Sequence, residues 1–193
     1  MENLDVDFIK SRINSNISVQ EALLKESSNI NKIAENFSKC LEKGGKIILF
    51  GNGGSAADSQ HIAAELSGKF YNSKRPGLAA ISLNTNASSL TAIANDFSFD
   101  EVFSRQLEGL LDSKDLVVGI STSGNSINVF NGLDKAKKIG AITVSFTGNS
   151  SGKLNSVSDF SLCIPSKDTP RIQESHILVG HIICEIVEKK LFG

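Results

Sequence analysis

The sequence predicts a three-layer α/β/α sandwich around a five-stranded parallel sheet, of the flavodoxin-like kind, and two patterns indicate it. Short apolar segments alternate with segments of helical periodicity from residue 46 onward, which favours strand–helix–strand units and a parallel sheet. The apolar segments are continuous rather than alternating, as expected of strands covered by helices on both faces. Ligands of such sheets bind at the carboxyl ends of the strands.

Hydrophobic periodicity sets the expected elements. Strands are expected at residues 46–50, 78–83, 116–120, 141–146 and 160–164, with helices at about 55–67, 87–95, 99–111, 126–139 and 171–191. Helical spacing also covers about 6–42, until Gly44 and Gly45 end it. We therefore expect one domain over residues 1–193, in which residues 1–43 form helices that pack on the sheet and serve oligomerisation.

The composition is that of an ordinary soluble globular protein, since 40% of the 193 residues are hydrophobic and 21% are charged. The net charge of −1 gives no electrostatic reason to expect a nucleic-acid or membrane partner. No run is long enough to span a membrane, and residues 1–7 do not have the pattern of a signal peptide. Cys40, Cys163 and Cys184 are widely spaced and form no C-x-x-C pair, so we expect reduced thiols in a cytoplasmic protein.

Two loops rich in glycine and serine each follow an expected strand and precede an expected helix. The first runs from Gly51 to Asp58 and the second from Gly119 to Ser126. Glycine lets the backbone turn tightly and expose its N–H groups, and the helix that follows directs its positive end at the loop. Serine and threonine add hydroxyl donors. We therefore expect the two loops to form one phosphate-binding cup.

Other interpretations fit these loops less well. The spacing Gly51-x-Gly53-x-x-Ala56 matches the looser dinucleotide fingerprint, but the next strand ends at Leu83-Asn84-Thr85 without the acidic residue that binds a ribose. A Walker loop would need Gly-Lys-Ser/Thr, and a nucleophile elbow would need a glycine where Ser123 stands. Either loop alone could be a simple turn, but two loops at strand–helix junctions favour a binding site.

His61 and Glu65 are four residues apart, so a helix presents them on one face beside the first loop. An exposed pair without function would have the same spacing.

The last helix carries His176 and His181 among apolar residues, a setting in which histidine is often buried in the core. Two interpretations stay open: His61, Glu65 and His181 bind a divalent metal such as zinc, or Glu65 and His181 act directly as an acid/base pair. Gln173 precedes His181 by about 12 Å along the helix axis, so one metal ion could scarcely contact both.

Six segments together resemble the phosphoheptose isomerase family of sugar isomerase (SIS) domain proteins. They are Gly51–Asp58, His61-(x)3-Glu65-Leu66-Ser67-Gly68, Ala94–Phe97, Gly119–Ser126, Arg171–His176 and Gly180-His181. The resemblance extends over nearly the whole chain. The segments are specific as a set, whereas the two loops alone mark only the wider SIS group.

The resemblance implies an aldose–ketose isomerase that converts sedoheptulose 7-phosphate to D-glycero-D-manno-heptose 7-phosphate, the first step toward ADP- or GDP-heptose for lipopolysaccharide or capsule. It also implies a cytoplasmic homotetramer with sites at subunit interfaces and one zinc ion per subunit. The positions that match the family's substrate-binding residues are Asn52, Gly53, Gly54, Ser55, Asn95, Asp96, Ser121, Thr122, Ser123, Ser126 and Gln173. Those that match its zinc ligands are His61, Glu65, Gln173 and His181, and Glu65 and His181 also match its catalytic pair.

The chain departs from the family pattern at two places. Thr169-Pro170 stands where some members carry an acidic residue, and Lys69 stands where others carry arginine. Two alternatives to the isomerase stay open. One is a non-catalytic SIS tetramer that binds the bacterial replication initiator, a group that tends to lack the residues matching Glu65 and His181. The other is a different sugar-phosphate SIS enzyme, such as an amino-sugar phosphate etherase or a hexulose-phosphate isomerase.

Overall fold

Five parallel strands form the centre of the molecule, and the computed structural model describes residues 4–193, with residues 1–3 outside the described part. The strands are β1 Ile47–Gly51, β2 Ala80–Ser82, β3 Leu116–Ser121, β4 Ile142–Thr147 and β5 Phe160–Cys163. The helices are α1 Leu4–Leu23, α2 Ser27–Glu42, α3 Gly54–Ser67, α4 Ala87–Asp96, α5 Ser104–Leu110, α6 Ile127–Ile139 and α7 Thr169–Phe192, with 3-10 turns η1 Leu24–Glu26, η2 Phe99–Glu101 and η3 Gly152–Val157. The predicted fold class is confirmed.

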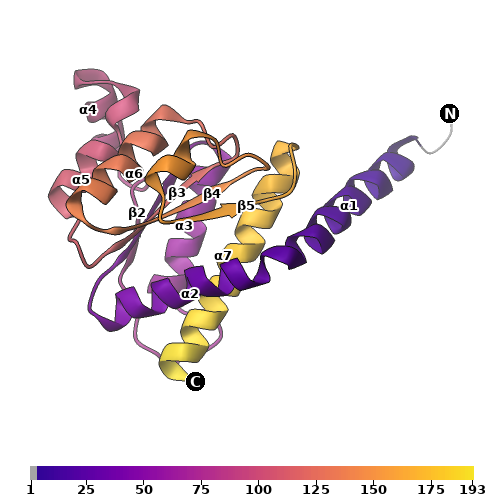
Figure 1. The fold of residues 1–193 in the computed structure, drawn as a ribbon, viewed down its shortest axis with the longest axis horizontal. Helices are drawn as coiled ribbons and strands as arrows, with labels where there is room; N and C mark the ends of the chain where they lie inside the picture. Colours follow the sequence, from indigo (N-terminus) through magenta and orange to yellow (C-terminus); the bar gives the residue numbers. More distant parts are fainter. Residues whose placement is uncertain (1–3) are drawn as a thin grey trace.

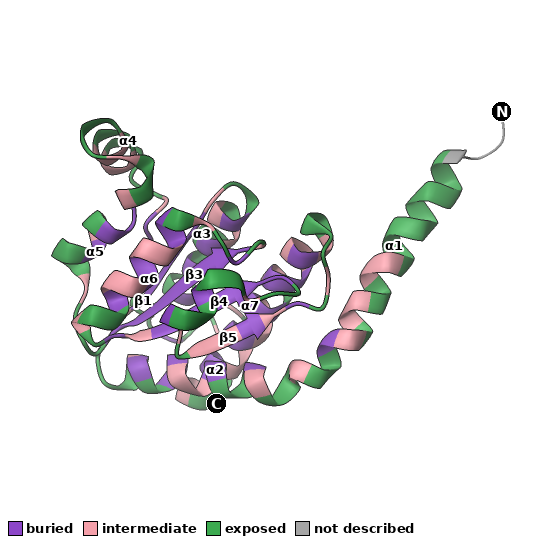
Figure 2. Ribbon diagram, turned by 45° about the horizontal axis from the view of Figure 1, so that its top comes forward, coloured by how far each residue is buried: buried purple, intermediate pink, exposed green. Residues whose placement is uncertain are grey.

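Helices cover both faces of the sheet (Figure 1). Side chains of one strand alternate between the two faces. Ile47 and Leu49 of β1 pack with α2, α3 and α7, whereas Ile48 and Phe50 pack with α5 and α6. This explains the continuous apolar strands, because each side chain enters one of two hydrophobic cores. Figure 2 shows the central strands as the most buried part of the chain.

The strand order places the two glycine/serine loops side by side. The order is β2-β1-β3-β4-β5 and every pair is parallel. After β1, the chain adds β2 on one side of that strand. It then crosses to the other side of β1, where it adds β3, β4 and β5 in turn. Ligands of open parallel sheets bind at such a reversal of strand order, outside the carboxyl ends of the strands. The loops after β1 and β3 lie at this position.

Helix α1 extends away from the sheet domain as an arm, while α2 packs on the sheet (Figure 1). Most of the arm is exposed in Figure 2. Leu23, at its end, is buried in the core, but Phe8, Ile9, Ile13 and Ile17 have exposed fractions of 61%, 55%, 56% and 48%. The arm therefore presents a row of apolar residues to its surroundings.

Several boundaries differ from the expected ones. Strand β2 has only the three residues Ala80–Ser82, and the helix expected at 99–111 is divided into η2 and α5. The division lies where Val102 and Phe103 turn into the core and the Ser104 hydroxyl bonds the Glu101 carboxylate. Helix α7 begins at Thr169, because a proline in the first turn needs no intrahelical N–H bond.

The three cysteines are free thiols, as predicted. Cys40 and Cys184 are buried, and burial raises the pKa of Cys40 to about 11 and that of Cys184 to about 12. These two thiols are therefore protonated at neutral pH and serve as core residues.

Among the helices within residues 4–193, none combines the length and the hydropathy that a membrane crossing requires.

Candidate active site

The loop after β1 turns through Gly53, whose φ of 57° lies in the left-handed region that favours glycine. Gly54 then begins α3 with the side chain of Gln173, from α7, packed against it. A Cβ at Gly54 would lie 2.5 Å from Nε2 of Gln173, so only glycine fits here without a shift. Ser55 follows and is buried. The first loop is therefore shaped by two glycines and closed on one side by Gln173.

The loop after β3 directs several hydroxyl groups at one another. The Ser121 hydroxyl lies 2.9 Å from that of Ser126 and 3.4 Å from that of Ser123. Thr122 is fixed through its carbonyl, which accepts from the N–H of Gly148 after β4. Ser126 is the N-cap of α6, but its side chain does not cap that helix, nor does any side chain cap α3 within the described residues. The N-termini of α3 and α6 both follow these loops, and the positive end of a helix is suited to an anion. In α3 the N–H groups of Ser55 and Ala56 already bond the carbonyls of Asn52 and Gly53.

Two asparagine amides hold the first loop from either side. The side chains of Asn52 and Asn128 exchange two hydrogen bonds, of 2.8 and 2.9 Å, and so join the first loop to the start of α6. On the other side, the Asn84 amide bonds both the carbonyl and the N–H of Gly51. Sequence reasoning missed Asn84 and Asn128. The only signal was their position just after β2 and just after the second loop.

The imidazoles of His61 and His181 meet the carboxylate of Glu65 between α3 and α7. Nε2 of His61 lies 3.2 Å from Oε1 of Glu65 and 3.3 Å from Nε2 of His181. One ligand atom from each residue lies within 4.8 Å of the others. The His61 and Glu65 side chains are 48% and 26% exposed, so the cluster opens to solvent in the isolated chain.

This cluster fits a zinc ion in donor type and spacing. Two imidazole nitrogens and one carboxylate oxygen are a common three-ligand zinc set. Tetrahedral zinc with bonds of about 2.0–2.1 Å separates its ligand atoms by roughly 3.3 Å, and the two closest pairs here lie 3.2 and 3.3 Å apart. A single proton on Nε2 of His61 could serve only one of its two neighbours, so a cation would satisfy the set better than hydrogen bonds alone.

Asn95 and Asp96 are not brought to this cluster. They are exposed at the end of α4, and the side chain of Asn95 bonds that of Asp96. Both Figure 1 and Figure 2 show α4 projecting from the body on the side away from α1 and α7. Gln173 of α7 lies beside Gly54 of α3. Gly54 precedes His61 by seven residues, which is two turns of α3. The single chain therefore assembles the cup and the cluster, with Asn95 and Asp96 apart from both.

His176 proves to be a core residue rather than a site residue. Its side chain is fully buried and Nε2 lies 3.1 Å from the carbonyl oxygen of Thr147. Burial lowers its pKa to about 4, so the ring is neutral at physiological pH and donates to that carbonyl. The contact attaches α7 to the end of β4, three residues after Gln173.

Comparison with known proteins shows the class of this α/β protein. Residues 13–148 match the SIS domain family model. The chain is 50% identical over 189 residues to the phosphoheptose isomerase of Sulfurimonas denitrificans, covering 96% of each chain. It is 48% identical over 190 residues to that of Clostridium acetobutylicum, covering 97% of this chain and 96% of the relative.

Solved structures agree with these relatives. The phosphoheptose isomerase GmhA of Neisseria gonorrhoeae superimposes with a TM-score of 0.89 at 38% identity, covering 95% of this chain and 98% of its own. The phosphoheptose isomerase of Francisella tularensis gives a TM-score of 0.92 at 31% identity, covering 96% and 98%. The chain belongs to the phosphoheptose isomerase family of SIS-domain proteins.

Proposed function

We propose that the chain interconverts sedoheptulose 7-phosphate and D-glycero-D-manno-heptose 7-phosphate, as an aldose–ketose isomerase. The observation that carries this proposal is the convergence of His61, Glu65 and His181 within 4.8 Å. His61 and Glu65 belong to α3, which begins at the first glycine/serine loop, and His181 belongs to α7. The phosphoheptose isomerase family supports the same activity. The product would feed the synthesis of nucleotide-activated heptose for surface glycans.

The isomerisation moves one proton between adjacent carbons and needs no oxidant. Glu65 takes a proton from C1 of the open-chain ketose, and the electron pair forms a C1–C2 double bond while the C2 oxygen gains a proton. The resulting enediol loses the proton of its C1 oxygen, and Glu65 returns its proton to C2, which leaves an aldehyde at C1. His181 moves the protons on the oxygens, since a neutral imidazole can both accept and donate.

The two loops would hold the 7-phosphate and so place the distant carbons at Glu65. The positive N-terminal ends of α3 and α6 would attract a dianion, and the hydroxyls of Ser55, Ser121, Ser123 and Ser126 would donate to it. Asn52, Gly53, Gly54, Thr122 and Gln173 complete the proposed contacts. Positioning of this kind supplies a large share of the barrier reduction in bound reactions.

His61, Glu65 and His181 would hold a zinc ion, with Gln173 as a further ligand if its side chain turns toward α3. The ion would polarise the oxygens of C1 and C2 and favour the enediolate. Glu65 and His181 remain the groups that move protons. A chelator therefore tests the metal separately from the base.

We also propose a cytoplasmic homotetramer whose sites are shared between subunits. Three features support it: the apolar row on α1, the open side of the His61 cluster, and the distance of Asn95 and Asp96 from that cluster. In a tetramer, Asn95 and Asp96 of one subunit would contact the substrate of another.

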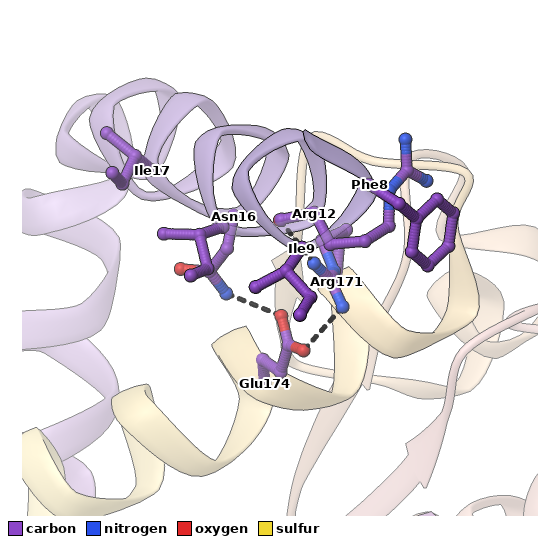
Figure 3. Close-up of a pocket in the computed structure, with 8 residues that line it drawn as sticks. Phe8, Ile9, Arg12, Asn16, Ile17, Arg171 and Glu174 are labelled. Atoms are coloured by element: carbon purple, nitrogen blue, oxygen red, sulfur yellow. Dashed lines mark hydrogen bonds and ion pairs between the residues drawn. The ribbon is translucent and has the colours of Figure 1, made fainter. Parts of the chain in front are cut away.

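Figure 3 shows the hydrogen bonds between α1 and α7, at a pocket that apolar side chains of α1 line together with Arg171 and Glu174. Asn16 donates to Glu174, whose other carboxylate oxygen accepts from Arg171, and Arg171 also donates to the carbonyl oxygen of Arg12. These contacts orient the arm on α7, beside the Gln173 position. The exposed side chains of Phe8, Ile9, Ile13 and Ile17 are then left for a partner copy.

A proton-exchange assay tests the activity. Sedoheptulose 7-phosphate is incubated with the protein in deuterated water and followed by NMR, with and without a chelator. Glu65→Gln keeps the shape of the side chain and removes the base, so turnover should fall by about 10²-fold or more. Asn131→Ala is the control, because the Asn131 side chain bonds the carbonyl of Asp100 and belongs to neither the loops nor the cluster. Absence of turnover by the metal-replete wild-type chain would instead favour a non-catalytic SIS protein or another sugar phosphate.

A further inference from the structure

A buried ion pair lies just beyond the Glu65–His181 pair. Nε of Arg75 lies 2.6 Å from Oε2 of Glu188, and the two side chains are only 1% and 8% exposed. Arg75 belongs to the segment between α3 and β2, and Glu188 lies on α7. Buried ion pairs of this kind often add little net stability, because desolvation offsets their attraction. In some proteins such pairs fix a geometry instead.

The guanidinium of Arg75 holds the end of α3 that carries Glu65. Nη2 donates to the carbonyl oxygen of Glu65 at 2.7 Å, and Nη1 donates to that of Leu66 at 2.9 Å. The last carbonyls of a helix have no partner within the helix and are free to shift unless another group binds them. Arg75 thus fixes the backbone of Glu65 directly.

The carboxylate of Glu188 holds the segment that contacts His181. It accepts from three successive N–H groups, those of Phe70, Tyr71 and Asn72, at 3.2, 2.8 and 2.6 Å. The ring of Phe70 lies beside that of His181, with 5.8 Å between their centroids. Glu188 also follows His181 by seven residues, two turns of α7, so both lie on one side of that helix.

We propose that Arg75 and Glu188 are positioning residues, which together set the separation of Glu65 and His181. Arg75 acts on the backbone of Glu65, and Glu188 acts on His181 through Phe70. The proposal rests on the proposed isomerase activity for its kinetic consequence, but not for its geometric one. Each guanidinium nitrogen of Arg75 and each carboxylate oxygen of Glu188 makes at least one hydrogen bond within the chain. Both side chains are also buried, so neither is placed to touch substrate.

The test compares Glu188→Gln and Arg75→Lys with a matched control, Asp115→Asn. Asp115 is also a fully buried carboxylate that binds a cation and two backbone N–H groups, those of Lys46 and Asp112. It lies at the amino end of the central strand, directly before β3. Each variant is measured for melting temperature, kcat and KM, and for the ring signals of its histidines by NMR. The chain has only three histidines, and His176, bonded to β4, is the internal reference.

We expect Glu188→Gln and Arg75→Lys to lower kcat by about 10-fold or more, since small misplacements of catalytic groups have such effects. KM should change by less than about 3-fold, because the phosphate loops are untouched. The His181 ring signals should shift as Phe70 moves, while those of His176 stay. Asp115→Asn should lower the melting temperature with kcat and the His181 signals unchanged.

The proposal is overturned if Glu188→Gln and Arg75→Lys leave the His181 signals in place, or if kcat falls no further than in Asp115→Asn at equal loss of stability. The ring signals are read without substrate. An inactive wild-type chain would therefore contradict the proposed activity, while the NMR comparison would still decide the positioning role. Arg75→Lys keeps the charge, so it provides the answer if Glu188→Gln does not fold.

Discussion

Gly180 of α7 lies directly against Ile62 of α3. A Cβ at Gly180 would lie 2.6 Å from Cδ1 and 2.7 Å from Cγ1 of Ile62. Both residues immediately adjoin the cluster, since His61 precedes Ile62 and His181 follows Gly180. The missing side chain lets the two helices cross closely enough for the two imidazoles to meet at 3.3 Å. The proposed metal site therefore depends on a glycine that carries no ligand.

Gly180→Ala should separate His61 from His181 and lower kcat by about 10-fold or more, because the added methyl group would displace the Ile62 side chain and, with it, α3. Ile62→Ala removes both atoms that the methyl group would meet. The double variant should therefore recover much of the lost kcat, with an interaction energy of about 0.5–3 kcal/mol. Steady-state kinetics and zinc titration of the four proteins check this. If the effects of the two substitutions on kcat were purely additive, the close crossing of α3 and α7 would not determine the geometry of the site.

Asn128→Ala should raise the KM for the sugar phosphate by about 10-fold, because the amide pair that joins the two phosphate loops is lost. The inhibition constant of inorganic phosphate should rise in parallel, which separates phosphate binding from chemistry. Asn131→Ala is the matched control, since Asn131 lies on the same helix but bonds the carbonyl of Asp100. Equal KM values for the two variants would contradict a role for the Asn52–Asn128 pair.

His176 should make the fold sensitive to mild acid. Its pKa is about 4 in the folded chain and about 6.5 when unfolded, so the unfolded chain binds the proton first as pH falls. The contribution of neutral His176 to the free energy of unfolding is therefore fully present above about pH 6.5. It declines as pH falls toward 4, and the loss at pH 5 is about 2 kcal/mol. Urea unfolding at pH 7.5 and pH 5 measures this. His176→Gln should lose less stability than wild type between the two pH values, and an equal loss would exclude His176 as the cause.

The local parts of the site could be predicted from the sequence. The two loops follow strands, and His61 and Glu65 share a helix face, because both facts depend only on neighbouring residues and helical periodicity. The strand order, which brings the loops together, follows from general rules for parallel sheets. The eight-residue spacing between Gln173 and His181 on one helix also predicted that Gln173 would lie away from His181.

Contacts between distant segments could not be predicted in this way. The meeting of His61 and His181 depends on how closely α3 and α7 cross, which Gly180 decides. Arg75 lies in a loop and Glu188 in an apolar helix, and neither has a spacing that indicates a pair. The division of residues 99–111 was missed for a similar reason, since the burial of Val102 and Phe103 overrides helical periodicity there.

The apolar row on α1 should determine assembly. Ile13→Asp with Ile17→Asp would place two charges on the face proposed to pack against a partner copy, where burying them is unfavourable. Sedimentation should show the wild-type chain as a tetramer and this variant as a smaller species. The variant should keep its far-UV circular dichroism, because Ile13 and Ile17 are exposed, whereas Leu23 in the core and polar contacts to α7 hold the helix. Asn14→Asp with Ser18→Asp adds the same charges to other exposed positions of α1 and should leave the tetramer intact. If the Ile13 and Ile17 variant remained a tetramer, assembly would have to use another surface.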